Sequence, residues 1–493
     1  MLSTLLLAAR LGPDIQLLAG MQKGRLGLPF FYGAVMSYVV GIFVLCLVLG
    51  PNVSSFWVGN VGFYDTQRLL LCLAVTLGAV RACARLAGSA PGAGRCGRHN
   101  GNLRGPSSQA QQVWGGLGLI ACMGLWSASL AASPRHALAE YALYVLLGVS
   151  VVQMAQEARK ASVRRGVLWA LGGACLLHES KSLVFYAWWL ADRMTLTPDP
   201  FMVGFSNMRF VNHFQTATLP LLALLTTTYV PTRKWRVVSW GVTALWWALA
   251  FVLGGRGTQL GMAAGCGMCL VLFGQRAWTA GYLRQMVGAC LAGVVLAWCL
   301  QWAIPYAVTG PMPDDFLFGK LNRLEDGGSI QTRLALWRAA WGMFLQHPLL
   351  GAGPMHFAAL PNAMHLDASA PHNWVLQIAA EWGGIVLLAV LMLLGMAVKG
   401  IMHTRVWVRE GDITPAKQEW MAYCTAFFAL WTDGLVSNTF MVPIILTTVA
   451  VVFALMLGMA NEHGWIRPDF APDEIRWFRP RWFLDGHFDV PGT

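Results

Sequence analysis

Long apolar runs separated by short polar segments recur along the chain. A helix that crosses a bilayer needs about 20 mostly apolar residues, because each residue advances the helix by about 1.5 Å. Runs of this kind predict about twelve membrane-spanning helices, at residues 30–50, 69–87, 113–132, 137–155, 166–190, 214–230, 237–253, 258–274, 286–304, 374–398, 419–436 and 439–460. The pattern is typical of an all-α polytopic membrane protein.

The predicted helices divide the chain into four parts. Residues 1–304 hold helices one to nine, residues 305–373 form a long connection, residues 374–460 hold helices ten to twelve, and residues 461–493 form a tail. Connections longer than about 15 residues are usually functional or disordered. This one contains an apolar stripe at helical spacing, which we expect to lie on the membrane surface or to cap the bundle. The stripe consists of Ile330, Leu334, Trp337, Trp341 and Phe344.

The positions of the basic residues predict the orientation in the membrane. Most of the 35 Lys and Arg fall in alternate connections, and such segments face the cytoplasm. This predicts cytoplasmic N and C termini and a periplasmic loop with short helices at residues 305–373. Charged groups inside a span are costly unless they face the bundle interior or a wet cavity. Such groups are His178, Glu179 and Lys181 in the run 166–190, and Asp433 near an outer helix end. We expect them to be either structural or part of a substrate cavity.

Composition supports a lipid environment and excludes nucleic acid as a partner. Hydrophobic residues make up 56% of the chain and charged residues 12%, whereas a soluble domain carries about 25% charged residues. The net charge of +12 forms no basic stripe interleaved with aromatic residues, so we expect a bilayer and no nucleic acid. The 11 Cys lie within apolar runs or on the predicted cytoplasmic side, which argues against a disulfide framework.

Three arginines lie beside polar motifs on the predicted external side. Arg209 precedes the sixth helix, Arg256 lies in a glycine-rich hairpin, and Arg333 lies in the long connection. A guanidinium group donates two parallel hydrogen bonds to phosphate oxygens and stays charged when partly buried. The set therefore predicts a diphosphate site. For each arginine taken alone, the alternative is a side chain that extends along the apolar surface to the interface.

His372 lies between Pro371 and Asn373, where the tenth helix is expected to begin. There the helix dipole disfavours the imidazolium and lowers the pKa of the histidine, which leaves a neutral imidazole that accepts a proton near pH 7. A packed or capping histidine is the alternative. No metal-ligand constellation or nucleotide-binding motif is visible, and Asp314 and Asp315 fit a solvated loop, so we expect no metal and no cofactor.

Four motifs follow one another along the chain. They are NHFQ at 212–215, GRG at 255–257, TRLALWRAAWGMFLQHPLLGAGPMHF at 332–357 and HNWVLQIAAEWGGIVLL at 372–388. In this order they resemble the O-antigen ligase and O-antigen polymerase superfamily of bacterial envelope glycosyltransferases. The resemblance implies a GT-C-like fold in the bacterial inner membrane, with an active site that faces the periplasm.

The resemblance also implies substrates and residue roles. The donor would be an undecaprenyl-diphosphate-linked glycan, and its transfer would need no metal or nucleotide. Arg209 and Arg256 would bind the diphosphate, and His372 would act as the base that activates the acceptor hydroxyl, with inversion at the anomeric carbon. Further substrate-binding positions would be Arg333, His213, Asn212, Gln259, Glu381 and Trp337.

The acceptor stays open among a sugar of the lipid A core, a second lipid-linked repeat, and a Ser or Thr of a secreted protein. These correspond to an O-antigen ligase, an O-antigen polymerase and a protein O-oligosaccharyltransferase. A transporter or lipid flippase is the alternative from another class. Transporters tend to have repeated halves and helices broken at the midplane, and the two halves of this sequence show no evident repeat.

Overall fold

The computed structural model describes residues 108–191, 208–309, 327–359, 370–437, 440, 443–463 and 465. The predicted helices 30–50 and 69–87, most of the tail 461–493, and parts of the connection 305–373 lie outside the described residues. Within this part of the chain the backbone forms helices and no strand. The all-α prediction is therefore confirmed for the described residues.

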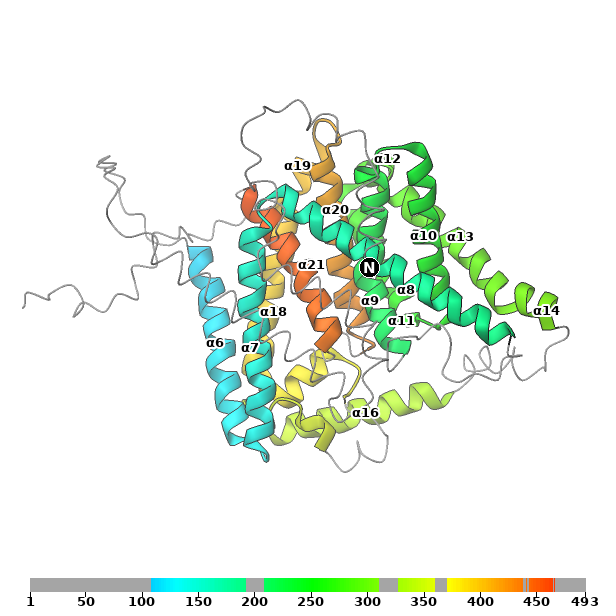
Figure 1. Ribbon diagram of the computed structural model, residues 1–493. Coiled ribbons are helices and arrows are strands. Elements are labelled where there is room, and N and C mark those ends of the chain that lie inside the picture. Colours follow the sequence, from blue (N-terminus) through cyan, green and yellow to red (C-terminus); the bar gives the residue numbers. More distant parts are fainter. Residues whose placement is uncertain are drawn as a thin grey trace, which may run out of the picture.

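Each predicted span inside the described ranges corresponds to a helix (Figure 1). The long helices are α6 (Ser108–Leu130), α7 (Pro134–Glu157), α8 (Ala161–Ala191), α9 (Met208–Leu224), α10 (Arg233–Val252), α11 (Arg256–Phe273), α13 (Tyr282–Trp298), α18 (Trp374–His403), α20 (Pro415–Asp433) and α21 (Pro443–Glu462). The shorter elements that matter below are η2 (Leu225–Tyr229), α12 (Gln275–Thr279), α14 (Ile304–Thr309), α16 (Gly327–Gln346) and α19 (Arg405–Arg409). Among the described residues, five helices are long and apolar enough to cross a membrane, which supports an integral membrane protein.

α9 runs through the centre of the bundle. Its residues 211–224 are all buried, and it packs against α10, α11, α20 and α21. Polar groups inside such a core need partners, and the hydroxyl of Thr218 donates to the carbonyl of Phe214 at 2.7 Å. α9 continues into the π-helical turn η2 at one end. At its other end it holds Arg209 and Asn212 in its first two turns.

Three glycines set the close packing of α11 on α20. Gly257, Gly261 and Gly265 recur every four residues and so lie on one face of α11. A Cβ added at Gly261 would lie 2.5 Å from the carbonyl oxygen of Ala429, and one at Gly265 would lie 2.4 Å from that of Thr425. Small residues at this spacing let two helix backbones approach closely inside a membrane. In this antiparallel packing, the start of α11 lies beside the end of α20, at Asp433.

α18 is interrupted at Gly383, which has a φ of 83°. The turn that follows α16 fills the break: Ala352 N donates to Ala380 O at 3.0 Å, and Gly353 N donates to Glu381 O at 2.9 Å. In return, Gly384 N donates to Pro348 O at 2.8 Å. The backbone groups released by the interrupted helix are thereby satisfied. Two of the sequence motifs, HPLLGAG and the AEWGG of the tenth helix, thus form one interlocked unit.

α16 lies across one end of the bundle, as the apolar stripe predicts (Figure 1). Its buried face consists of Leu336, Ala340 and Met343, which pack with Phe357 and Ala380. Other apolar residues of α16, including Leu334, Trp341 and Leu345, are exposed. We expect this exposed side to contact the membrane surface, because apolar groups favour lipid over water.

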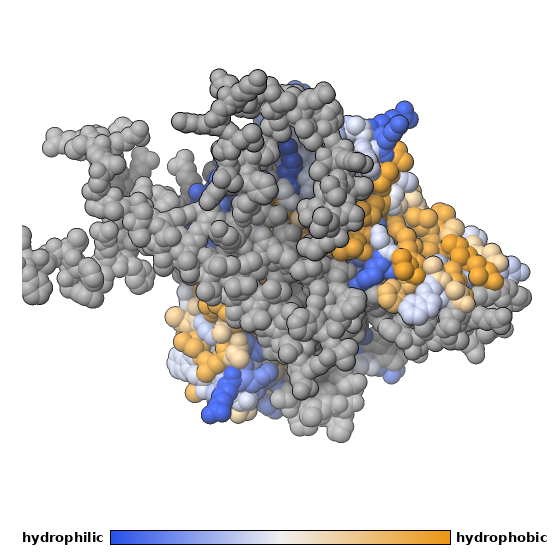
Figure 2. Space-filling view, viewed as in Figure 1, coloured by the Kyte–Doolittle hydropathy of each residue, from blue (hydrophilic) through white to orange (hydrophobic). Residues whose placement is uncertain are grey.

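The two ends of the bundle carry different residues. The end at the top of Figure 1 holds α12, α19 and the first turn of α10, and we call it the basic end because Arg233, Arg276 and Arg405 lie there. We call the opposite end the α16 end. α9 and α11 begin at the α16 end, and α20 finishes there. The side of the molecule formed by α10 and α13 is mainly hydrophobic (Figure 2).

α8 is continuous through the polar residues that interrupt its apolar sequence. His178 and Glu179 are buried, each with 1% of its surface exposed. The imidazole of His178 meets the indole of Trp246 edge-on, with 5.5 Å between the ring centroids. This contact favours the structural interpretation of His178.

Candidate active site

Arg209 and His372 meet at the α16 end. Arg209 lies in the first turn of α9 with its side chain exposed, and its Nη1 is 3.1 Å from Nε2 of His372. An arginine can only donate a hydrogen bond, so Nε2 is the acceptor and the ring proton of a neutral His372 resides on Nδ1. The two side chains come from segments 163 residues apart.

His372 directly precedes the N-cap of α18. Asn373 is the cap, and its Oδ1 accepts from Val375 N at 3.0 Å and Leu376 N at 3.1 Å. Trp374 N donates to Gly434 O at 3.0 Å, which ties the start of α18 to the end of α20. His372 itself has a φ of 57°, a left-handed conformation that costs about 1–2 kcal/mol for a residue other than glycine. The surrounding structure therefore holds this imidazole in a fixed and strained position.

Arg256 and Arg333 bring two more cations to the same end. Arg256 opens α11 after a turn in which Gly254 has a φ of 66°, and Arg333 lies half-buried on α16. Burial, followed by the charges of Arg209 and Arg256, lowers the pKa of Arg333, while the charge of Asp433 acts in the opposite direction. The three arginines that the sequence predicts as a set are therefore close enough to repel one another.

The imidazole of His372 is neutral, and the structure shows causes that the sequence did not reveal. Burial, followed by the positive charges of Arg209 and Arg333, lowers the pKa of His372 to about 3. The lowered pKa agrees in direction with the prediction from the helix N-terminus, and burial and the neighbouring cations are the causes that the structure adds. The imidazole is therefore neutral at pH 7, as predicted, and its role as a base stays a prediction.

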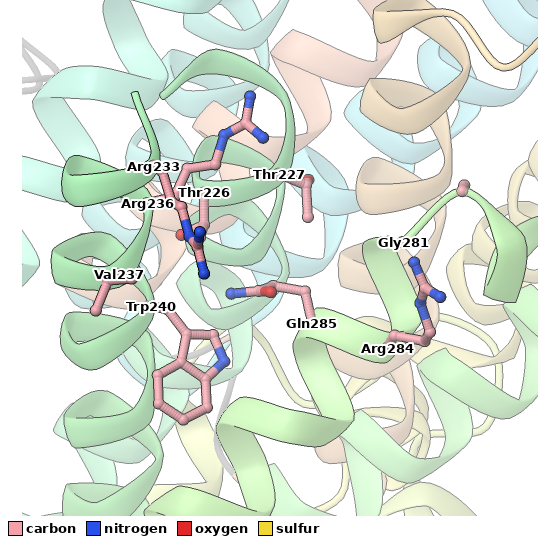
Figure 3. A pocket seen from close by; sticks show the side chains of 10 residues that line it. Thr226, Thr227, Arg233, Arg236, Val237, Trp240, Gly281, Arg284 and Gln285 are labelled. Carbon is pink, nitrogen blue, oxygen red and sulfur yellow. The ribbon is translucent and has the colours of Figure 1, made fainter. Parts of the chain in front are cut away.

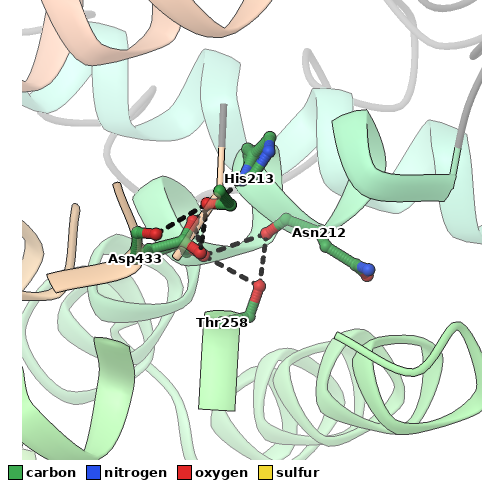
Figure 4. Close-up of polar contacts among 6 residues, drawn as sticks. Asn212, His213, Thr258 and Asp433 are labelled. Carbon is green, nitrogen blue, oxygen red and sulfur yellow. Dashed lines mark hydrogen bonds and ion pairs between the residues drawn. The ribbon is translucent and has the colours of Figure 1, made fainter. Parts of the chain in front are cut away.

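A buried hydrogen-bond network surrounds Asp433 (Figure 4). His213 Nδ1 is 2.8 Å from Asp433 Oδ2, and the hydroxyl of Ser437 donates to Asp433 Oδ1 at 2.9 Å. The hydroxyl of Thr216 lies 3.2 Å from the same carboxylate. Asp433 is buried, with 1% of its surface exposed, and this network holds its carboxylate in place. The charge of Asp433 raises the pKa of Arg333, whereas the charges of Arg209 and Arg256 lower it.

Asn212 and Thr258 join α9 and α11 within this network. The hydroxyl of Thr258 donates to the carbonyl of Asn212 at 2.7 Å. The amide side chain of Asn212 points away from Asp433 (Figure 4), and its buried Oδ1 has no hydrogen-bond partner among the described residues. The sequence gives no direct sign of Thr216, Thr258 or Ser437. Asp433 was noted in the sequence as a charged group near an outer helix end, and the structure places it against α11, where a Cβ at Gly257 would lie 2.2 Å from Asp433 Oδ1.

Trp337 and Glu381 have distinct surroundings. Trp337 is one turn beyond Arg333 on the same side of α16, and its buried Nε1 has no hydrogen-bond partner within the described ranges. Glu381 accepts from Phe357 N at 3.1 Å and from Gln377 Nε2 at 3.2 Å. Glu381 therefore supports the turn after α16 instead of pairing with an arginine. Gln259 lies in the first turn of α11 and is half-buried.

The described residues contain no group of three or more His, Cys, Asp and Glu side chains that could hold a metal ion. The site at the α16 end is instead a set of cations with one neutral imidazole. Such a set is suited to a ligand with several negative charges, because each guanidinium can form paired hydrogen bonds with phosphate oxygens.

The described residues show the apolar helices of an integral membrane protein, with a cationic site at one end of the helical bundle, and one segment of the chain matches a known family. Residues 241–391 match the family model described as O-antigen ligase. This match supports the resemblance to the O-antigen ligase and polymerase superfamily. The matched segment includes Arg256, Arg333 and His372, whereas Arg209 and Asp433 lie outside it. No curated protein matches the chain.

Proposed function

We propose that the protein transfers a glycan from an undecaprenyl-diphosphate carrier to an acceptor hydroxyl at the periplasmic face of the inner membrane, as an O-antigen ligase does. The observation that carries this proposal is that Arg209 and Arg333 lie beside His372, with Arg256 close to Arg333. Like charges close together repel one another, and an anion bound between them relieves that repulsion. The family match supports glycosyltransferase activity of the ligase or polymerase type.

The three arginines bind the diphosphate of the donor in this proposal. They come from α9, α11 and α16, so they surround a ligand from different sides. Negative charge grows on the diphosphate as it leaves the sugar, and fixed guanidinium groups stabilise that charge. The indole N–H of Trp337, which has no partner among the described residues, supplies a further donor on the Arg333 side of the site.

His372 is the base in the proposed reaction. The acceptor oxygen forms a bond to the anomeric carbon, the bond from that carbon to the diphosphate oxygen breaks, and the acceptor proton passes to Nε2 of His372. A single displacement of this kind inverts the configuration at the carbon. Nε2 first has to lose its hydrogen bond from Arg209, which is 3.1 Å away. The bound diphosphate attracts Arg209 and offsets the charges that lower the pKa of His372. Donor binding would thus free Nε2 and raise the pKa of His372.

We propose a sugar of the lipid A core as the acceptor, which is the activity of a ligase. The alternative activities are those of a polymerase and of a protein O-oligosaccharyltransferase. Deletion of the gene in the native host, followed by gel analysis of lipopolysaccharide, separates them. We expect full-length polymer to remain on its lipid carrier. Single-repeat capping of the core would indicate a polymerase, and unchanged lipopolysaccharide would indicate a protein or another polysaccharide as acceptor.

The transporter alternative receives little support from the break in α18. Transporters use unwound helix segments to bind their substrates. The break in α18 at Gly383 is occupied by the backbone of the turn after α16. Release of undecaprenyl diphosphate by purified wild-type protein, and its loss in the His372→Ala variant at equal protein level, tests the enzyme proposal directly. A flippase would move the donor without cleaving it.

A further inference from the structure

A second cationic site lies at the basic end of the bundle. A cavity of about 480 Å³ opens between the first turns of α10 and α13 and the end of η2 (Figure 3). Arg233 and Arg236 enter it from α10, and Arg284 and Gln285 enter it from α13. Because the 20 residues of α10 extend about 30 Å, this cavity is about one membrane thickness away from Arg256 and His372.

The arginines of this cavity lack acidic partners. No Asp or Glu lines the cavity, and within the described part of the chain no carboxylate pairs with Arg233, Arg236 or Arg284. The buried Arg164 at the same end differs, because it pairs with Glu419 at 2.6 Å and with Glu462 at 2.7 Å. The cavity therefore has an excess of positive charge that a bound anion would balance.

Local structure holds this charge in place. The Nε of Arg236 donates to Val230 O at 2.9 Å, which anchors the side chain and leaves its two terminal nitrogens available. α10 begins at Arg233 and α13 begins at Tyr282, so the positive ends of two helix dipoles face the cavity as well. Thr227 and Gln285 add uncharged hydrogen-bonding groups to its wall.

An exposed apolar stripe on α13 continues from the cavity. Starting at Arg284, the residues on the same side of the helix are Val287, Leu291, Val294 and Trp298. Their exposed fractions are 39%, 64%, 48% and 59%. The same side of the molecule is hydrophobic over α10 and α13 and hydrophilic next to α12 (Figure 2). A cationic cavity that continues into an apolar stripe matches the anionic headgroup and the apolar chains of a phospholipid.

We propose that this cavity binds the phosphodiester headgroup of an anionic membrane phospholipid, whose acyl chains lie along α13. Arg233, Arg236 and Arg284 contact the phosphate, and Thr227 and Gln285 contact the headgroup hydroxyls. Trp240 and Val237 form the apolar wall where the headgroup meets the chains. Basic pockets between helix ends on the side of the membrane that carries anionic lipids are suited to this role.

Native mass spectrometry of the full chain in neutral detergent tests the proposal. Phosphatidylglycerol and phosphatidylcholine are added separately to the wild type and to an R233Q/R284Q double variant. We expect the wild type to retain phosphatidylglycerol in preference to phosphatidylcholine, and the variant to bind phosphatidylglycerol about tenfold or more weakly, because each basic residue adds substantially to the attraction. Equal binding of phosphatidylglycerol by wild type and variant would overturn the proposal.

A matched control separates the pocket from general charge. Arg276 and Arg405 lie exposed at the same end but outside the cavity, so an R276Q/R405Q variant removes the same charge without changing the pocket. We expect it to bind phosphatidylglycerol as the wild type does, and an equal loss in both double variants would also overturn the proposal. Inorganic phosphate serves as the second probe. If it displaces phosphatidylglycerol at equal concentration, the pocket takes a soluble phosphate and not a lipid.

Discussion

The guanidinium of Arg209 donates a hydrogen bond to Nε2 of His372 across 3.1 Å. This contact occupies the lone pair that a general base needs, and the charge of Arg209 contributes to the low pKa of His372. The free protein thus holds its proposed base in an inactive form. A diphosphate that draws Arg209 away would release the lone pair and raise the pKa of His372 at the same time. Binding of the donor and activation of the acceptor would then be coupled through one pair of residues.

Replacement of His372 by Asn tests its role as the base. Asn tolerates the left-handed backbone conformation seen at this position, but its amide cannot accept the acceptor proton. We expect the release of undecaprenyl diphosphate to slow by about 10²–10⁴-fold, with unchanged protein levels and unchanged donor binding. Wild-type rates in the Asn variant would exclude His372 as the base.

Replacement of Arg256 by Ala tests the diphosphate site. The loss of one positive charge that stabilises the leaving group should lower kcat/KM for the lipid-linked donor by about 10²–10³-fold. Arg338, exposed on α16, provides the matched control, because Arg338→Ala removes the same charge from the same end. We expect the control to retain activity within a factor of a few. A similar loss in both variants would mean that the effect is general electrostatics and not a clamp.

The low pKa of His372 predicts proton uptake when a diphosphate binds. At pH 5 the free imidazole is neutral, because its pKa lies at about 3. A bound anion offsets the charges of Arg209 and Arg333, so the pKa of His372 rises and a fraction of the imidazole becomes protonated. Calorimetry with farnesyl diphosphate in two buffers of different ionisation enthalpy measures the number of protons taken up.

The His372→Asn variant serves as the reference in this measurement, because it retains any proton exchange by the diphosphate itself. We expect wild type to take up more protons than the variant at pH 5. The difference should decline as the pH rises above the pKa of His372 in the complex. Identical proton numbers for the two proteins would mean that the ligand leaves the pKa of His372 unchanged.

The sequence predicted the helices well because a bilayer imposes a simple requirement on length and polarity. The runs 237–253 and 258–274 coincide with α10 and α11 to within a few residues. The approach of Arg209 to His372 was also foreseeable, because both precede predicted spans on the same side. The residue chemistry of Arg and His then indicated which of the external positions to propose as a site.

The sequence did not predict the contacts that depend on how distant helices pack. Glu381 resembled a substrate ligand, yet its carboxylate binds the backbone of Phe357. That role depends on the break at Gly383, and no local pattern distinguishes a glycine that breaks a helix from one that does not. The direction of the pKa shift of His372 was predicted, but the cations that contribute to it were not, because they come from α9 and α16.

Replacement of Gly383 by Ala tests whether the break in α18 supports the site. A Cβ at this position would lie 2.1 Å from Leu349 O, and the φ of 83° alone costs a residue with a side chain about 1–2 kcal/mol. We expect a lower thermal unfolding temperature and a loss of transfer, because the turn after α16 would leave the break and Arg333 and His372 would separate. Gly395, on the same helix, has open space around its Cβ position, so Gly395→Ala should leave both the unfolding temperature and the transfer rate near wild type. If Gly383→Ala were as stable and as active as Gly395→Ala, the interlocked backbone would not be what positions the site.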